Sequence, residues 1–308
     1  MTLCAILIMP ELPEAETVRK GLALTVLNSA IEEIEVFDQR CLKKHPGGAD
    51  DFLSIMRGRS FKAAVRRGKF IWLPLDIEGF AMVMHLGMSG QALIRTKDFA
   101  PENQVRLHMN LDNGLQFRFS DQRLFGSLMI DQLQPVEGHS AGFSPESDNQ
   151  HEIPSSVAHI ARDPLDQEFN LEGVKKKIKN RSAGIKHVLL DQQLVSGIGN
   201  IYADESLWRA RLHFNQPANS ISQRKLTELF GHVREVLAEA CEQGGTSFDQ
   251  QYKNINGQSG YFSQNLNAYG QTGKPCNRCG RPISRQSWEN RGSHFCPVCQ
   301  RIRKQKLK

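Results

Sequence analysis

The chain has few cysteines outside one cluster and no long apolar run. Three of its seven cysteines, Cys4, Cys41 and Cys241, stand singly along the 308 residues. An odd, scattered set of thiols does not make a disulfide framework, so this usage favours a reducing compartment. The apolar run over residues 3–9 is too short to span a membrane and lacks the basic start of a signal peptide. We therefore expect a cytoplasmic protein with no membrane partner.

The other four cysteines form two Cys-x2-Cys pairs near the C-terminus: Cys276, Cys279, Cys296 and Cys299. Paired thiolates at this spacing are typical of a closed tetrahedral zinc site, which is structural rather than catalytic. The alternative interpretation is four unrelated thiols or two disulfides. Arginines lie between the two pairs, at Arg278, Arg281, Arg285 and Arg291. The sequence thus predicts one structural Zn²⁺ in a module that faces a polyanion.

Positive charge is modest overall but gathered into runs. The formal net charge is +6, and basic residues concentrate in Arg66-Arg67-Gly68-Lys69, in residues 175–181 and in the tail after Gln300. Such clustering favours nucleic acid over a small-molecule substrate. A charged run can also be only a solvated helix face, so no single run establishes binding.

Apolar periodicity divides the chain into two differently patterned halves. An amphipathic helix is predicted over residues 13–28. Short alternating runs predict strands over residues 31–37, 61–64, 70–74, 80–85, 91–96, 105–111 and 115–120. Residues 136–159 are rich in Gly, Ser and Pro and predict a surface loop. Helical patterns follow over residues 171–179, 185–191, 203–210 and 222–243. A β-sandwich or barrel followed by a mainly helical domain is expected.

One glycine-rich segment has the composition of a phosphate site. Residues 196–205 place glycines and Asn200 ahead of a helix, whose exposed N–H groups can bind an anion. A tight linker between two helices would look the same. Lys186 and Arg181 lie just upstream and add positive charge.

The beginning of the chain contains a second chemical possibility. If translation starts at Met9, removal of that methionine leaves Pro10 as a terminal secondary amine. Terminal amines titrate near 8, so a useful fraction is unprotonated and can attack C1′ of a deoxyribose. Glu11 is then a candidate acid or base at the sugar. The alternative is an ordinary turn that leads into a helix.

Six motifs in order resemble the formamidopyrimidine-DNA glycosylases, which excise oxidised purines and nick the resulting abasic site. The motifs are Pro-Glu-Leu-Pro-Glu at 10–14, Arg-Arg-Gly-Lys at 66–69, His-Leu-Gly-Met-Ser-Gly at 85–90, Asp-Gln-Arg-Leu-Phe-Gly at 121–126, Gly-Ile-Gly-Asn-Ile-Tyr-Ala at 197–203 and the four-cysteine finger. The resemblance extends from Pro10 to Gln300.

The resemblance implies an α+β multidomain fold. A catalytic β-sandwich flanked by helices is expected over residues 10–136, preceded by an extension at 1–9 and followed by a linker at 137–162. A helix-two-turn-helix DNA-binding domain is expected over 163–271, a zinc finger over 272–303 and a basic tail over 304–308.

The resemblance also implies roles for individual residues. Pro10 corresponds to a Schiff-base nucleophile, Glu11 to the proton donor at the sugar, Lys69 to the residue that assists β-elimination, and Arg291 to the finger arginine of δ-elimination. Contacts with the DNA backbone are implied for His85, Arg181, Asn200 and Tyr269, and Lys186 stays a candidate phosphate contact because of its place before the glycine-rich segment.

Other positions correspond to residues that read or enclose the lesion. Met88, Arg123 and Phe125 resemble a trio that fills the gap left by the flipped base, and with Leu12 they separate this family from the sister branch that prefers oxidised pyrimidines. Residues 252–262 resemble the loop that closes over the base. Two positions depart from the pattern. Leu124 stands where many relatives carry a second arginine, and Gln104, still a candidate DNA contact, stands where some carry a DNA-contacting histidine.

The expected function is therefore base-excision repair of oxidised purines in duplex DNA, by a bifunctional glycosylase and abasic-site lyase. We expect a monomer associated with the nucleoid. A non-catalytic binder of damaged DNA is the alternative if the extension before Pro10 is retained, and a zinc-ribbon adaptor without lesion specificity is a third reading.

Overall fold

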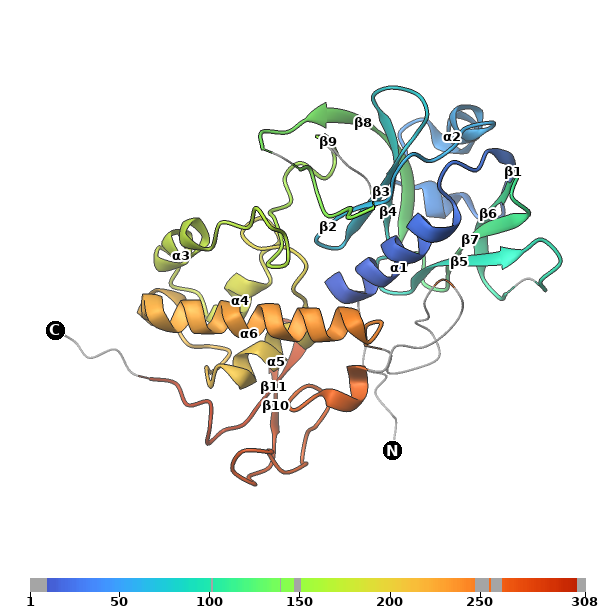
Figure 1. The fold of residues 1–308 in the computed structure, drawn as a ribbon. Coiled ribbons are helices and arrows are strands. Elements are labelled where there is room, and N and C mark those ends of the chain that lie inside the picture. The colour runs from blue at the N-terminus through green and yellow to red at the C-terminus, as the bar shows by residue number, and fades with distance from the viewer. Residues whose placement is uncertain are drawn as a thin grey trace. The chain divides into compact units, whose positions relative to one another are not determined.

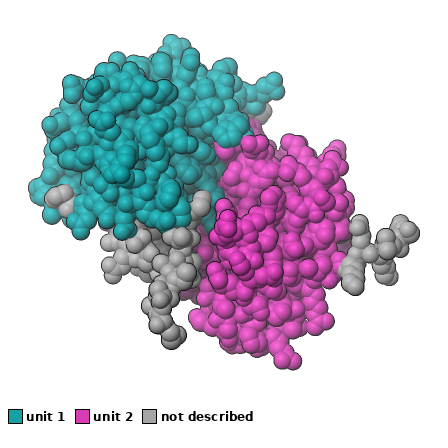
Figure 2. Space-filling view, turned by 180° about the vertical axis from the view of Figure 1, so that it is seen from behind, with its two compact units in different colours: residues 1–159, 243–261 teal, residues 160–242, 262–308 magenta. Residues whose placement is uncertain are grey.

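The computed structural model describes residues 10–100, 102–138, 140–146, 151–246, 255 and 262–303 (Figure 1). The chain divides into two compact units, drawn in two colours in Figure 2. Unit 1 comprises Met1–His159 and Gln243–Tyr261, and unit 2 comprises Ile160–Glu242 and Phe262–Lys308. Among the described residues, no helix is both long enough and apolar enough to cross a membrane.

Unit 1 contains two antiparallel sheets. The first has the strand order β1-β6-β7-β5, with bounds Ile31–Val36, Val105–Leu111, Leu115–Asp121 and Gly90–Thr96. The second has the order β2-β3-β4-β8-β9, with bounds Val65–Arg67, Phe70–Pro74, Phe80–His85, Ser127–Pro135 and Glu152–Pro154. Alternating apolar residues of both sheets enter one core, in which Met82 and Phe117 are fully buried. This arrangement confirms the predicted β-sandwich.

Helices cover this core and add to it. Helix α1 (Leu12–Thr25) contributes Val18 and Leu22, and α2 (Gly48–Met56), which follows the short η1 (Gln39–Leu42), contributes Phe52. Ile255 also belongs to this core and packs where α1 has no side chain, since a Cβ at Gly21 would lie 2.5 Å from its Cδ1. Apart from Ile255 and Phe262, the segment expected to close over a base lies outside the described residues, as do the extension at 1–9 and the tail at 304–308.

Unit 2 is mainly helical, as expected, and ends in a hairpin. Its elements are α3 (Leu171–Lys179), α4 (Ile185–Leu189), α5 (Asn200–Arg209), η2 (Ala218–Ser220), α6 (Gln223–Glu242), η3 (Phe262–Asn265), β10 (Ser284–Trp288) and β11 (Arg291–Phe295). Helices α5 and α6 pack together (Figure 1). The antiparallel β10–β11 pair lies between the two cysteine pairs in sequence.

The structure corrects some of the predicted elements. Residues 61–64 are not a strand. Phe61 makes only isolated bridges with Leu27 and Leu75, and the stretch, buried except for Lys62, connects other elements. Residues 136–159 are not wholly a loop, since β9 pairs with the end of β8. Helix α2 and strand β8 were not predicted. The domain boundaries stay predictions, although residues 243–261 group with unit 1 rather than with the helical unit.

Candidate active site and nucleic-acid interface

The first turn of α1 is closed by two glutamates, immediately after Pro10. Glu11 is the N-cap and Glu14 is at the N3 position of a capping box, in which Glu14 Oε2 accepts from the Glu11 backbone N–H at 2.8 Å. Glu14 Oε1 also accepts from the Thr246 N–H at 2.7 Å. Pro10, Glu11 and Glu14 are all buried. Reciprocal capping fixes the chain where it enters the helix, and with it the position of Pro10.

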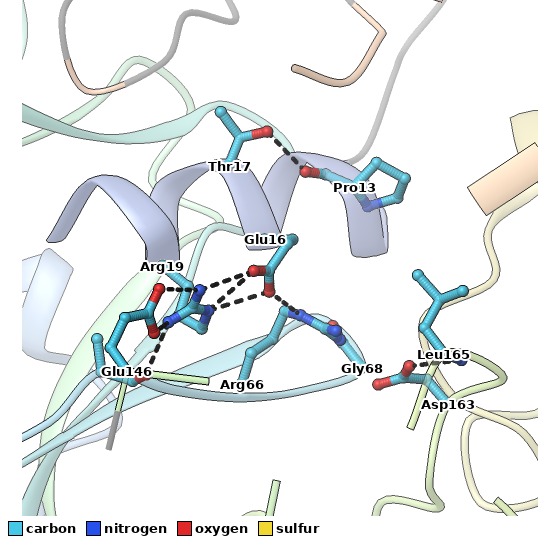
Figure 3. Close-up of polar contacts among 10 residues, drawn as sticks. Pro13, Glu16, Thr17, Arg19, Arg66, Gly68, Glu146, Asp163 and Leu165 are labelled. Carbon is cyan, nitrogen blue, oxygen red and sulfur yellow. Dashed lines mark hydrogen bonds and ion pairs between the residues drawn. The ribbon is translucent and has the colours of Figure 1, made fainter. Parts of the chain in front are cut away.

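A buried ion-pair network ties the turn that carries Lys69 to the same helix (Figure 3). Arg66 donates from Nε to Glu16 Oε2 at 2.8 Å and from Nη1 to the Gly68 carbonyl at 3.2 Å. Arg19 donates to Glu16 and, at 2.6 Å, to Glu146. Both arginines are only 1% exposed. Arg66 is therefore not part of a cationic surface, contrary to the interpretation of the basic run; it holds the β2–β3 turn on α1, where Lys69 is half-buried.

His85, at the end of β4, is held as a neutral imidazole. Burial and the nearby positive charges of Lys69, Lys44 and Lys43 lower the pKa of His85 to about 4. Its Nδ1 accepts from the Gly87 N–H at 3.2 Å, so the remaining proton is assigned to Nε2. The ring therefore offers an N–H donor, which suits a phosphate oxygen.

The three expected gap-filling residues lie on two turns of unit 1. Met88 is half-buried in the β4–β5 turn, whereas Arg123 and Phe125 are exposed in the β7–β8 turn. The Arg123 guanidinium carbon lies 5.0 Å from the centre of the Phe125 ring. Leu124, between them, has φ +56° and its carbonyl accepts from the Lys43 ammonium. Gln104 is exposed at the start of β6, also with positive φ, of +72°.

In unit 2 the structure brings Asn200 next to the strand that begins with Arg291. Asn200 is the first residue of α5, and its Nδ2 donates to the Gly292 carbonyl at 3.1 Å. Arg291 is exposed and follows a tight turn in which Glu289 and Asn290 have φ of +44° and +59°. Two of the predicted DNA contacts therefore lie side by side at one end of β11.

Lys186 is not on the surface, although the expected phosphate contact would require an exposed ammonium group. It is fully buried, with Nζ 2.6 Å from Asp204 Oδ1 and 2.8 Å from Ser293 Oγ. The Trp288 ring covers it at 5.2 Å. The same Asp204 accepts from the His294 N–H at 2.8 Å. Lys186 and Asp204 thus fasten β11 to α4 and α5.

The two remaining expected contacts differ in exposure. Arg181 is exposed and lies 3.2 Å from Asp191. Tyr269 is buried, and its backbone N–H donates to Glu205 Oε1 at 2.8 Å, as does the Ala268 N–H at 2.7 Å. Burial raises the pKa of Glu205, although these backbone donors oppose the rise. Glu205 therefore fixes the turn that carries Tyr269.

The four cysteines of the finger are gathered as the spacing predicts. Their sulfur atoms all lie within 4.8 Å of one another, which fits four thiolates around one Zn²⁺. Burial and the neighbouring sulfurs raise the pKa of Cys299 to about 12. A divalent cation at the centre removes that penalty, because it stabilises the thiolates against one another.

Several residues that organise the site have no recognisable signal in the sequence. These residues, Glu16, Asp204 and Glu205, lie on helices and in the sequence look like ordinary polar surface positions. Their partners are distant in sequence, since Arg66 is 50 positions from Glu16 and His294 is 90 positions from Asp204. Aligned sequences or coordinates are needed to find such pairs.

Three family models match the chain in order. They are the formamidopyrimidine-DNA glycosylase N-terminal domain at residues 9–128, the H2TH domain of the same enzymes at 160–251, and a zinc finger found in FPG and IleRS at 273–302. A curated formamidopyrimidine-DNA glycosylase of Leifsonia xyli is 49% identical over 96% of this chain and 100% of its own length. That of Rhodococcus erythropolis is 47% identical over 95% and 97%. The chain belongs to the formamidopyrimidine-DNA glycosylase family.

Solved structures agree with this assignment. A Lactococcus lactis Fpg in complex with DNA containing an abasic site is 29% identical, covers 94% of this chain and 99% of its own, and has a TM-score of 0.79. A variant of that enzyme bound to DNA containing Fapy-dG has a TM-score of 0.81. This formamidopyrimidine-DNA glycosylase family member is accordingly a base-excision repair DNA glycosylase, and its four finger cysteines hold one structural zinc ion.

Proposed function

We propose that this glycosylase removes oxidised purines, namely 8-oxoguanine and formamidopyrimidines, from duplex DNA and then cleaves the abasic site by β,δ-elimination. The proposed nucleophile is the secondary amine of Pro10, which requires a chain that begins at Pro10. The family model, whose match begins at residue 9, supports this start. Complexes of relatives with abasic and Fapy-dG DNA support the substrate class.

The chemistry proceeds through a covalent intermediate. The Pro10 nitrogen attacks C1′ of the flipped nucleotide, the bond between C1′ and the base breaks, and the base leaves with the proton that the attacking nitrogen loses. Glu11 donates a proton to the sugar-ring oxygen, so the ring opens to an iminium. Loss of a C2′ proton to solvent expels the 3′ phosphate, and loss of the C4′ proton in a second elimination expels the 5′ phosphate. Water then hydrolyses the remaining iminium and frees Pro10. Lys69 and Arg291 hold the flanking phosphates while these groups depart.

The observation that carries this proposal is the joint fixing of Pro10, Glu11 and Lys69 within unit 1. The capping box sets the first two, and the Arg66–Glu16 ion pair ties the Lys69 turn to the same helix. Holding catalytic groups in place before the substrate arrives supplies part of the rate that enzymes gain from orientation. The neutral His85 and exposed Arg123, with Asn200 and Arg181 in unit 2, are the proposed contacts to a single bound duplex per monomer.

Borohydride trapping on DNA containing 8-oxoguanine tests the nucleophile. The chain that begins at Pro10 is expected to form a covalent adduct and to nick the strand, because its amine is free. The full 308-residue chain is expected to form none, since Pro10 nitrogen is then in a peptide bond. Pro10→Gly in the shorter chain should retain binding and lose most nicking.

Equal trapping by the two chains would rule out Pro10 as the nucleophile. If the full chain alone occurs in cells and binds damaged duplex without trapping, the second candidate function applies: a non-catalytic binder of damaged DNA.

A further inference from the structure

Asp121, at the end of β7, has a carboxylate that is fully buried and bonded on both oxygens. Oδ1 accepts from the Ser89 hydroxyl and, at 3.1 Å, from the Arg123 N–H. Oδ2 accepts from the Gly126 N–H at 2.7 Å. The carboxylate therefore closes the β7–β8 turn at both ends and joins it to the β4–β5 turn.

The backbone of the same residue reaches a third turn. The Asp121 N–H donates to the Gln104 carbonyl at 3.1 Å, and the Asp121 carbonyl accepts from Arg106 Nε at 2.8 Å. Met88, Gln104, Arg123 and Phe125 lie on the three turns that meet at this one residue. Gln104 and Arg123 contact Asp121 through backbone atoms, so these contacts do not use their side chains.

The turns also pack too closely to move independently. A Cβ on Gly87 would lie 2.4 Å from the Phe125 carbonyl carbon, and one on Gly126 would lie 3.0 Å from Asp121 Oδ2. The Ser89 hydroxyl accepts from the Arg123 N–H at 3.1 Å, which adds a second link between the turns. The backbone is thus fixed, while the Arg123 and Phe125 side chains remain exposed.

From this geometry we propose that Asp121 is a positioning residue that makes Met88, Arg123 and Phe125 enter the duplex as one rigid wedge and so sets how excision depends on the base opposite the lesion. The inference rests on the proposed function, in which these side chains fill the gap left by the flipped base. Side chains that wedge into a base stack must keep their place against the cost of unstacking. A hydrogen bond from Arg123 to the opposite base discriminates only if the guanidinium is held in one position.

Asp121→Asn is the direct test, because it keeps the shape and removes one acceptor. Whichever way the amide turns, its NH2 faces the backbone N–H of either Arg123 or Gly126, so the β7–β8 turn loses one of its two hydrogen bonds to residue 121. The assay measures affinity for duplexes that carry a tetrahydrofuran abasic analogue opposite each of the four bases. In wild type, the affinities for the best and the worst opposite base differ by some ratio, which we call the spread. In the variant this ratio is expected to fall roughly tenfold or more, since small displacements at such sites can cost up to about 100-fold. Because no bond is broken, this arm does not depend on Pro10 chemistry.

A second arm separates this inference from the proposed function. Borohydride trapping on a single-stranded oligonucleotide with an abasic site needs no wedge, so Asp121→Asn should trap at the wild-type rate. Both proteins in this arm are chains that begin at Pro10. If the wild-type chain of that length fails to trap, the Pro10 mechanism is wrong, while the four-base affinities still decide the role of Asp121.

Two further variants keep the test decisive. Ser89→Ala removes only the link between the β4–β5 and β7–β8 turns, so it should narrow the spread less than Asp121→Asn does. If Asp121→Asn does not fold, Ser89→Ala takes its place in the test. Asp76→Asn is the matched control, since Asp76 also accepts from a serine hydroxyl and a backbone N–H, at 3.1 and 3.2 Å. Asp76 follows β3, whereas His85 lies at the opposite end of the β3–β4 pair. An unchanged spread in Asp121→Asn, or an equal loss for all four bases, overturns the proposal.

Discussion

Charged residues that organise the site lie inside the fold rather than on its surface. Arg66 belongs to a basic run of the sequence and Lys186 is a single basic residue upstream of the glycine-rich segment, yet each is buried against one carboxylate, Glu16 or Asp204. A buried ion pair needs its partner, because an uncompensated charge in the interior is costly. Sequence clusters of positive charge therefore overstate the cationic surface that faces DNA.

His85 gives a residue-scale prediction about pH. Its pKa is about 4 in the folded chain against 6.5 unperturbed. Between these two values the unfolded chain binds more protons than the folded one, so the free energy of unfolding falls as the pH drops from 6.5 towards 4. This stability is fully present above pH 6.5. Allowing for partial exposure, the loss from this one residue is about 2 kcal/mol at pH 4.

The measurement is urea unfolding of wild type and His85→Gln at pH 7.5 and 4.5. Glutamine can accept from the Gly87 N–H but does not titrate, so the variant should lose less stability on acidification than wild type does. Titration of the His85 ring by NMR gives an independent midpoint. A midpoint near 6.5 would contradict the account, and His232→Gln, at a half-buried position of α6, is the control.

At the scale of elements, the sequence predicts the helices and strands whose own residues carry an apolar periodicity. Strands β3, β4 and β6 and helix α3 have the predicted bounds, because alternating or helical apolar residues begin and end with turn signals. The stretch 61–64 has the composition of a strand, but whether it pairs depends on distant neighbours. Strand β9 has only three residues, Glu-Ile-Pro, too few for an alternating pattern, and it pairs with the end of β8.

Lys186 gives an element-scale prediction, since it joins α4, α5 and β11. Lys186→Met leaves the Asp204 carboxylate buried without its cation, so the free energy of unfolding should fall by ~3–5 kcal/mol. Adding Asp204→Asn should recover part of this loss, because the uncompensated charge is removed and the His294 N–H keeps an acceptor. Urea unfolding of the two single variants and the double variant measures the coupling.

The salt dependence of DNA binding distinguishes this role from a phosphate contact. A lysine that touches phosphate contributes about one unit to the slope of log K against log salt. Lys186→Met should leave that slope unchanged below its unfolding temperature. A slope reduced by about one, with stability intact, would restore the phosphate contact. Lys176→Met, at an exposed position of α3, controls for loss of one positive charge.

For the whole molecule, the motifs and their order identify the family, whereas the contacts between distant motifs had to be observed. The finger illustrates the difference. Its cysteine spacing predicts zinc, but nothing in the spacing shows that Cys276 and Cys296 pack in one cluster with Trp208 of α5. Arg278 adds to this contact, lying 3.8 Å over the Trp208 ring and donating to the Arg209 carbonyl at 2.9 Å. The zinc module and α5 are therefore expected to lose their order together.

Cys296→Ser tests this coupling. The variant should lose its zinc, because three thiolates and a hydroxyl bind the ion much less tightly than four thiolates. Duplex DNA binding should be abolished, since Arg291 and Asn200 both depend on β11, whose Gly292 carbonyl accepts from Asn200. Tryptophan fluorescence should shift to the red as Trp208 meets water. Metal analysis, fluorescence and DNA titration measure the three effects, with Cys241→Ser on α6 as the control that keeps the quartet. Normal DNA affinity in a zinc-free Cys296→Ser protein would mean that the finger does not present Arg291 and Asn200 to the duplex. A normal fluorescence spectrum would mean that α5 keeps its structure without the metal.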